Sequence, residues 1–202
     1  MKALKITPTL INSFNSIFKD FTYGNDPTES SAKSEIDFLK LLRKEPQEYN
    51  ESFEYGKRYE QKCYNYDIGE DNKEIVEIIK NGTFQVKRIK NLIVNGIRFQ
   101  LVGIADVVKG AYIYDIKTTK SSYNAPHYLD NSQTSAYFAL FPKAEQFGYL
   151  IHDYSTKQPK FYSEFYSRSQ VEPIENIIAQ FVNGMKQLGY WDTYVENWEI
   201  YL

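Results

Sequence analysis

The 202-residue sequence is poor in the residues that bind soft metals, with one cysteine, Cys63, and two histidines. One cysteine excludes a disulfide within the chain and an iron–sulfur cluster held by four thiolates. One cysteine and two histidines are also too few for the common zinc sites, which use four nitrogen and sulfur ligands.

Long apolar runs and a surplus of basic residues are also lacking. No apolar run is long enough to span a bilayer, and the N-terminus lacks a basic region followed by an apolar core. We therefore expect a cytoplasmic protein with no membrane partner. The net charge is −2, from 24 Lys and Arg against 26 Asp and Glu, whereas nucleic-acid binders are usually basic. This is mild evidence against nucleic acid, because an average can conceal a local basic patch.

The composition that is present, 42% hydrophobic and 25% charged, is typical of soluble globular proteins. The length predicts one domain over residues 1–202. Helices are expected at 7–21, with Thr7 as the N-cap before Pro8, and at 33–45, 51–67, 72–80 and 126–140. A further helix is expected from a Ser169–Glu172 capping box, or from a later start set by Pro173, to Gly189, with a short helix after it. Residues 22–32 are expected to form a polar loop. Strands are expected at 84–94 and 97–102, joined by a tight Asn95-Gly96 turn, around Asp106 and Asp115, and at 146–154 and 160–168. This order predicts a mixed α/β fold with a central sheet flanked by helices.

The stretch from Gly103 to Lys117 reads as a hairpin with its turn at Lys109-Gly110. In a two-residue loop, facing residue numbers sum to about 219, which places Asp106 opposite Ile113. Asp115 then lies diagonal to Asp106 on the same face, about 7–8 Å away, and Lys117 shares that face. A four-residue loop keeps this pairing, whereas a three-residue loop turns Asp106 to the other side.

Two acids in strands rich in isoleucine and valine need a partner, because aspartate is depleted in strands and a buried charge is costly. The alternative is a surface hairpin whose polar face carries two acids and a lysine. Oxygen ligands favour Mg²⁺ or Mn²⁺.

A third acid, Glu60, lies on the helix expected at 51–67. It shares a stripe at spacings of three and four with Phe53, Gly56 and Cys63. Gly56 would let another backbone come close to this helix. In the alternative interpretation, Glu60 pairs in solvent with Lys57 or Lys62.

Other polar residues have weaker patterns. Gln133 and Tyr137 are four apart, so they share one helix face. Four basic residues crowd one hairpin and are as consistent with a solvated face as with a DNA backbone track: Lys87, Arg88, Lys90 and Arg98. His127 has no visible partner, and His152 and Asp153 are expected in solvent or a turn. The aromatic C-terminal segment is expected in the core.

The ordered set Gly56-x-x-x-Glu60, Gly103-x-x-Asp106, Asp115-Ile-Lys117-Thr118 and Gln133-x-x-x-Tyr137 resembles the PD-(D/E)XK nuclease superfamily. Order and spacing are similar to its RecB-like and phage lambda-type exonuclease branch. The opening from Thr7 to Phe14 is also similar to the N-terminal helix of RecB-like nucleases, so the resemblance spans residues 7–140. Four motifs in order are more specific than any one of them.

The resemblance implies a restriction-endonuclease-like core in which Glu60, Asp106, Asp115 and the Ile116 carbonyl bind Mg²⁺ or Mn²⁺. It implies that Lys117 positions or activates the attacking water. The residues expected to support the site or contact the substrate are Gln133, Tyr137, Thr118 and Lys120. Many RecB-like members have histidine where Glu60 stands, and several add an iron–sulfur cluster that this chain cannot hold.

The expected function is a Mg²⁺-dependent DNA nuclease, an exonuclease rather than a site-specific endonuclease. The size fits a recombination or repair nuclease of a phage or mobile element, working beside a single-strand annealing protein, and a homo-oligomer is among the expected assemblies. The first alternative is a catalytically inactive member of the fold that binds DNA or protein. The second is an unrelated soluble binding domain.

Overall fold

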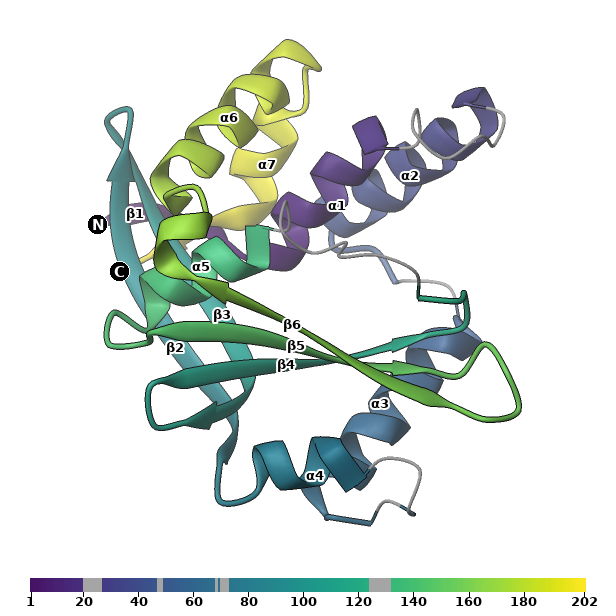
Figure 1. The fold of residues 1–202 in the computed structure, drawn as a ribbon. Helices are drawn as coiled ribbons and strands as arrows, with labels where there is room; N and C mark the ends of the chain where they lie inside the picture. Colours follow the sequence, from purple (N-terminus) through teal and green to yellow (C-terminus); the bar gives the residue numbers. More distant parts are fainter. Residues whose placement is uncertain (20–26, 47–48, 68, 70–72, 124–131) are drawn as a thin grey trace.

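The computed structural model describes residues 1–19, 27–46, 49–67, 69, 73–123 and 132–202 (Figure 1). Its strands are β1 (Lys2–Ile6), β2 (Thr83–Val94), β3 (Ile97–Lys109), β4 (Tyr112–Thr119), β5 (Gln146–Asp153), β6 (Lys160–Ser167) and β7 (Glu199–Tyr201). Its helices are α1 (Pro8–Lys19), α2 (Pro27–Leu42), α3 (Glu51–Tyr64), α4 (Lys73–Ile79), α5 (Ser132–Leu140), α6 (Ile174–Gln187) and α7 (Trp191–Trp198).

The strands form one mixed seven-stranded sheet in the order β6-β5-β4-β3-β1-β7, with β2 paired to β3. β1 is parallel to β3, and β4 is parallel to β5; the other pairs are antiparallel. Helices lie on both faces (Figure 1). The predicted mixed α/β class, with a central sheet flanked by helices, is confirmed.

The long strand β3 organises the sheet because both of its edges are used. β2 pairs along one edge, from Val94–Ile97 to Thr83–Val108. The other edge is shared, since β1 pairs only as far as Leu101 and β4 begins to pair at Val107. Residues 102–106 of β3 therefore face a gap between β1 and β4. Five residues of strand span about 16 Å, which leaves room for side chains to enter the sheet.

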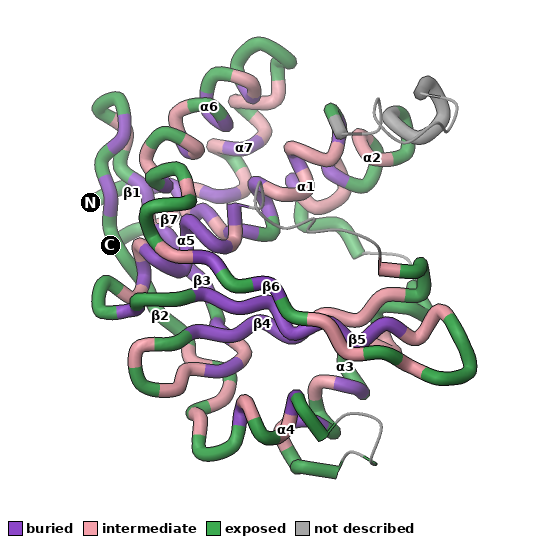
Figure 2. The backbone as a smooth tube through the Cα atoms, in the orientation of Figure 1, coloured by how far each residue is buried: buried purple, intermediate pink, exposed green. Residues whose placement is uncertain are grey.

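Two apolar layers hold the helices to the sheet. The larger packs α1, α2, α5, α6 and α7 against one face, and its buried members include Phe14, Phe99 and Phe181. The smaller packs α3 and α4 against the other face through residues such as Tyr59, Cys63 and Ile116. Burial is nearly continuous along β5 and through the middle of β4, buried and more exposed residues mix along β3, and much of β2 is exposed (Figure 2).

Several expected boundaries are wrong. The second helix begins at Pro27, inside the expected polar loop, and ends at Leu42. The strands expected before and around Asp106 form one continuous strand, and β1 and β7 were not expected. Residues 126–131 of the helix expected at 126–140 lie outside the described part of the chain.

Helix starts show which capping predictions hold. Thr7 Oγ1 accepts the Leu10 N–H at 3.2 Å, which confirms Thr7 as the cap before Pro8. The expected Ser169–Glu172 capping box is wrong: Ser167 and Gln170 form a box on a short 3₁₀ turn. Helix α6 starts after Pro173, the later start that this proline indicated, and Pro173 forms no side-chain cap hydrogen bond.

The C-terminal aromatics are in the core as predicted, with Tyr194 and Trp198 buried. Among the described residues, no helix is long and apolar enough to cross a membrane.

Candidate active site and metal centre

A cavity of about 410 Å³ opens at the gap beside β3. Its walls bring together acids, lysines and the start of helix α1. The lining residues are Lys5, Thr7, Pro8, Thr9, Glu60, Lys87, Val102, Gly103, Ile104, Asp106, Asp115, Lys117, Gln133 and Tyr137. The cavity therefore contains every side chain that the sequence placed in the catalytic set, together with the Gln133–Tyr137 pair.

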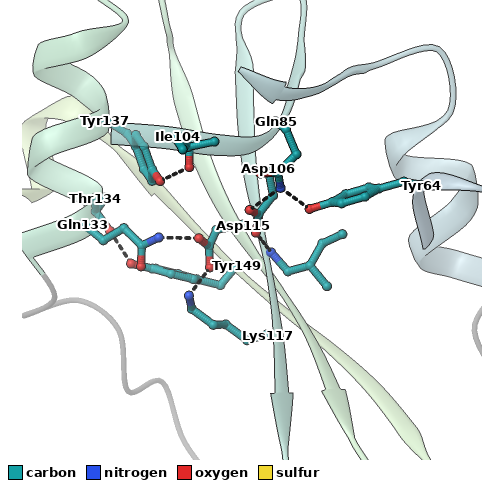
Figure 3. A network of polar contacts seen from close by, with 11 residues as sticks. Tyr64, Gln85, Ile104, Asp106, Asp115, Lys117, Gln133, Thr134, Tyr137 and Tyr149 are labelled. Carbon is teal, nitrogen blue, oxygen red and sulfur yellow. Dashed lines mark hydrogen bonds and ion pairs between the residues drawn. The ribbon is translucent and has the colours of Figure 1, made fainter. Parts of the chain in front are cut away.

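The gap leaves strand backbone groups unpaired, and side chains of the site satisfy two of them. Asp106 Oδ2 accepts the Ile116 N–H at 2.8 Å, so the carboxylate takes the position of a strand partner for β4. The Tyr137 hydroxyl donates to the Ile104 carbonyl of β3. Buried backbone groups require such partners, so the opening of the sheet and the placement of these side chains depend on each other (Figure 3).

Gly103 explains how helix α5 comes near enough for this contact. A Cβ atom at position 103 would lie 2.6 Å from Leu140 Cδ1 and 3.0 Å from Tyr137 Cε1. Both distances are shorter than normal van der Waals contact, so any larger residue would push α5 away from β3. The glycine of the Gly103-x-x-Asp106 motif thus has a packing role.

The predicted hairpin register is wrong by two residues. The facing pairs are Val107–Tyr114, Val108–Ile113 and Lys109–Tyr112, so the turn is Gly110-Ala111. Gly110 has φ +60°, a conformation that favours glycine. This register would put Asp106 directly opposite Asp115, but the two strands separate at that point. Both acids still line one cavity.

Asp115 is the most enclosed acid of the cavity, with 2% of its surface exposed. Gln133 Nε2 donates to its Oδ1 atom. Lys117 Nζ forms an ion pair with the Asp115 Oδ2 atom at 2.5 Å. Apart from this ion pair, Oδ2 has no hydrogen-bond partner among the described residues. The Lys117 ammonium group therefore balances the negative charge at Oδ2 of Asp115.

Helix α3 supplies Glu60 from the other side of the cavity. Asn50 caps the helix by accepting the Phe53 N–H at 3.1 Å. The predicted apolar stripe is partly wrong: Phe53 is 60% exposed, and Tyr59 and Cys63 are the buried residues of this helix. Lys57 pairs with Glu54 at 3.2 Å rather than with Glu60.

The close approach expected at Gly56 is made to a side chain rather than to another backbone. A Cβ atom there would lie 3.2 Å from Thr118 Oγ1. Gly56 therefore sets the spacing between α3 and β4, and Thr118 lies under the helix rather than among the cavity-lining residues. Lys120 is exposed beyond the end of β4 and also lies outside the lining.

The three carboxylates oppose one another's ionisation. Burial, then the negative charges of Asp115 and Glu60, raise the pKa of Asp106 well above its usual range, against the effect of Lys117. Burial and Asp115 also raise the pKa of Glu60. Such mutual repulsion identifies a place where a divalent cation would be stabilised.

Gln85 and Tyr64 belong to the site, although the sequence did not indicate them. Gln85 Nε2 donates to Asp106 Oδ1 at 3.3 Å and to the Tyr64 hydroxyl at 2.6 Å (Figure 3). Gln85 has φ +52° within strand β2, between the residue pairs Phe84–Val107 and Val86–Ala105 that flank Asp106. A left-handed residue other than glycine costs about 1–3 kcal/mol and is concentrated at functional sites. The only available signal was a glutamine in a strand, which is too common to notice.

The donor set fits a hard divalent cation, since carboxylate oxygens suit Mg²⁺ and Mn²⁺. Within the described ranges, no three His, Cys, Asp or Glu side chains are placed as a complete metal-binding set. In this arrangement Lys117 and Gln133 contact Asp115, while the Ile116 N–H and Gln85 contact Asp106. Binding would require Asp115 Oδ2 to exchange its contact with Lys117 for one with a cation.

The histidine predictions have separate outcomes. His127 lies outside the described residues. The expected solvent location is wrong, because His152 and Asp153 are 2% and 3% exposed, but the turn alternative holds for Asp153, whose Oδ1 accepts the Ser155 N–H at 2.9 Å just after β5. His152 stacks on Tyr59 with ring centres 4.0 Å apart, and its Nε2 is 3.0 Å from the Tyr55 hydroxyl. These aromatic contacts join β5 to α3 and explain the burial of His152.

No family model and no curated protein matches the chain. Among solved structures, the crystal structure of SSO0001 aligns with a TM-score of 0.57 at 15% identity, over 91% of this chain and 76% of that chain. An alkaline exonuclease from Laribacter hongkongensis aligns with a TM-score of 0.49 at 15% identity, covering 95% of this chain and 90% of that chain. At such low identity, the likeness to SSO0001 shows a shared fold and leaves the function open.

Proposed function

We propose that this protein is a divalent-metal-dependent DNA nuclease that hydrolyses phosphodiester bonds in the cavity beside β3. The observation that carries the proposal is the meeting of Glu60, Asp106, Asp115 and Lys117 in one cavity, although they come from three separate elements. Structural acids are normally neutralised by paired bases or placed in solvent. Here three acids face one another beside a single close lysine, a pattern typical of a catalytic cation site.

The residues that would hold Mg²⁺ or Mn²⁺ are Glu60, Asp106 and Asp115, with the Ile116 carbonyl as a further ligand. The bound cation would supply charge neutralisation for the phosphate and acidify a coordinated water. Gln133 would hold Asp115 through its Oδ1 atom, which leaves the Oδ2 atom for the cation. Tyr137 would keep the gap open by satisfying the Ile104 carbonyl.

Lys117 has the role closest to the reacting atoms. Its Nζ lies 2.5 Å from Asp115 Oδ2, so it faces the position that the ligands would surround. An ammonium group there would orient the attacking water and place positive charge beside the developing phosphorane. With Asp115 serving as a cation ligand, Lys117 would be able to donate a hydrogen bond to the phosphate or to the water.

The finer part of the proposal rests on the ordered motifs. Their spacing is similar to that of RecB-like and lambda-type enzymes, which supports an exonuclease acting on DNA ends. On the same ground we propose a role in recombination or repair in a phage or mobile element, beside a single-strand annealing protein. Comparing linear with covalently closed circular DNA would test the requirement for an end.

The primary test is cleavage of end-labelled linear DNA, single- and double-stranded, by purified protein in Mg²⁺, in Mn²⁺ and in EDTA. We expect cleavage that depends on the cation. Lys117→Ala should reduce the rate by about 100-fold or more, because an electrostatic contact to the transition state is lost.

Lys157→Ala is the matched control, since it removes the same charge from an exposed position between β5 and β6, outside the cavity. It should leave the rate within about twofold, as expected of a surface substitution. Circular dichroism and thermal unfolding would confirm that both variants fold. An absence of cleavage by the wild type on every substrate, with DNA binding retained, would instead identify a non-catalytic member of the fold.

A further inference from the structure

The β2–β3 hairpin carries an open face that continues away from the cavity. Residues paired across the hairpin point to the same side of the sheet, so the register assigns each basic residue to a face. Lys87 pairs with Ile104, and Ile93 pairs with Arg98. Lys5 of β1 joins this face through its pairing with Gln100. The side chains that define the open face are Lys5, Lys87, Ile89, Asn91, Ile93 and Arg98.

Large aliphatic side chains on this face are unusually exposed. Ile89, Ile93 and Ile104 are 52%, 69% and 46% exposed. Among the described residues, α3 and α4 cover this side of the sheet only near β4 and β5 and the far end of the hairpin, where Val107 packs against them. Figure 2 shows the resulting exposure along β2. Three exposed isoleucines on one sheet face mark a binding surface.

The charges on the hairpin divide between its two faces. Arg88 and Lys90 lie on the opposite side, where the Arg88 guanidinium is 5.5 Å from the Phe141 ring centre and Lys90 lines a pocket beside α5 and α6. The open face keeps Lys5, Lys87 and Arg98, and none of its defining positions is acidic. A protein with a net charge of −2 thus presents a locally basic surface, which favours a polyanionic occupant.

The open face runs directly into the candidate active site. Lys5, Lys87 and Ile104 also line the acidic cavity. From Ile104, the face extends six residues along β3 to Arg98, about 20 Å at the rise of a strand. That length corresponds to about six nucleotides at the 3.4 Å spacing of phosphates along one strand of B-form DNA.

We propose that the open face of β1, β3 and β2 is a track for a DNA strand that leads to the cavity. Lys5, Lys87 and Arg98 contact its phosphates, and the isoleucines pack against sugars and bases. This inference rests on the proposed nuclease function. It separates the groups that guide the strand from those that cleave it.

The test compares two double variants with the same charge change on opposite faces of one hairpin: Lys87→Ala/Arg98→Ala and the control Arg88→Ala/Lys90→Ala. The probe is a fluorescein-labelled single-stranded 20-nucleotide DNA, measured by fluorescence anisotropy in EDTA at several salt concentrations. We expect Lys87→Ala/Arg98→Ala to weaken binding by about tenfold and to reduce the salt slope by about 1.4, from about 0.7 for each lost contact. The control should bind like the wild type.

A third variant, Ile93→Asp, tests the apolar part of the surface and should also weaken DNA binding. Equal affinity and salt slope for both double variants would overturn the track, and cleavage by the wild type would show that the proposed function still stands. If Ile93→Asp dissociates an assembly in sedimentation velocity while Lys87→Ala/Arg98→Ala binds normally, the face joins copies of the chain and the track is wrong. A wild type that neither binds nor cleaves DNA would overturn both proposals.

Discussion

At the scale of single residues, Gln85 joins backbone strain to the candidate metal centre. Its φ of +52° is unfavourable for glutamine, but the conformation aims its amide at both Asp106 and Tyr64. Together with the Ile116 N–H, the amide satisfies both oxygens of Asp106. Groups that hold a metal ligand in place typically change metal affinity by about 10–100-fold when removed.

Replacing Gln85 with glycine separates stability from ligand positioning. Gln85→Gly removes the amide but suits a left-handed backbone, so we expect equal or greater thermal stability. We also expect Mn²⁺ affinity to fall about tenfold or more, measured by calorimetric titration without DNA.

Asn95→Gly is the matched control for this change, because Asn95 also has positive φ, +50°, at the far turn of the same hairpin. It should leave Mn²⁺ affinity unchanged. If Gln85→Gly retains wild-type affinity, the positioning role assigned to Gln85 is wrong.

At the scale of elements, the distance between α3 and β4 decides where Glu60 lies. Gly56 meets Thr118 across this contact, with 3.2 Å between an added Cβ and Thr118 Oγ1. The stack of Tyr59 on His152 holds the same helix to β5. Because α3 carries one of the three acids and the sheet carries the other two, a shift of this helix would disperse the site.

Gly56→Val should therefore impair catalysis by displacing Glu60. The added side chain overpacks the contact at a cost of about 1–3 kcal/mol, and we expect at least a tenfold loss of cleavage rate with the fold retained. Combining it with Thr118→Ala removes the opposing hydroxyl and methyl groups, so the double variant should recover much of the lost rate. A lack of recovery would show that Gly56 acts through helix propensity instead, and the Thr118→Ala single variant serves as the reference.

At the scale of the whole molecule, the cluster of acids links folding to pH and to cations. Unfolded aspartate and glutamate have pKa values of about 4, whereas the pKa values of Asp106 and Glu60 are raised in the fold. Between the two values, the folded protein binds more protons than the unfolded chain. The free energy of unfolding therefore falls as pH rises through that window when no cation is bound.

Divalent cations should reverse this loss. Saturation at about 100 times the dissociation constant adds about 2.7 kcal/mol, which corresponds to about 5–10 °C for a protein of this size. The increase in unfolding temperature caused by Mg²⁺ should grow from about pH 5 to about pH 8, because protons compete for the same carboxylates. Scanning calorimetry with and without Mg²⁺ would measure it.

Glu60→Gln provides the internal check on this linkage. The metal-free variant should be as stable as the wild type or more so, because one of three mutually repelling charges is gone. Its stabilisation by Mg²⁺ should be much smaller. A wild type whose unfolding temperature ignores Mg²⁺ at every pH would contradict the assignment of the acids as ligands.

Local patterns in the sequence were sufficient for the parts of the protein that depend on near neighbours. The Asn95-Gly96 turn, the Thr7 cap, the mixed α/β class and the acid and lysine spacing around Asp115 were all legible. Asp106 and Asp115 still line one cavity despite an error of two residues in the predicted register.

Only the tertiary structure decided how these parts meet. The insertion of β1 beside β3 opens the sheet at residues 102–106, and this pairing joins segments more than 90 residues apart. The docking of α3 brings Glu60 to the cavity, and the register of β2 brings Gln85 to Asp106 and divides the basic residues between two faces. Propensity and periodicity describe the chain over one or two turns or strands, whereas these contacts depend on packing between distant segments. The sequence thus determined which side chains are available for chemistry, and the gap between β1 and β4 decided where they come together.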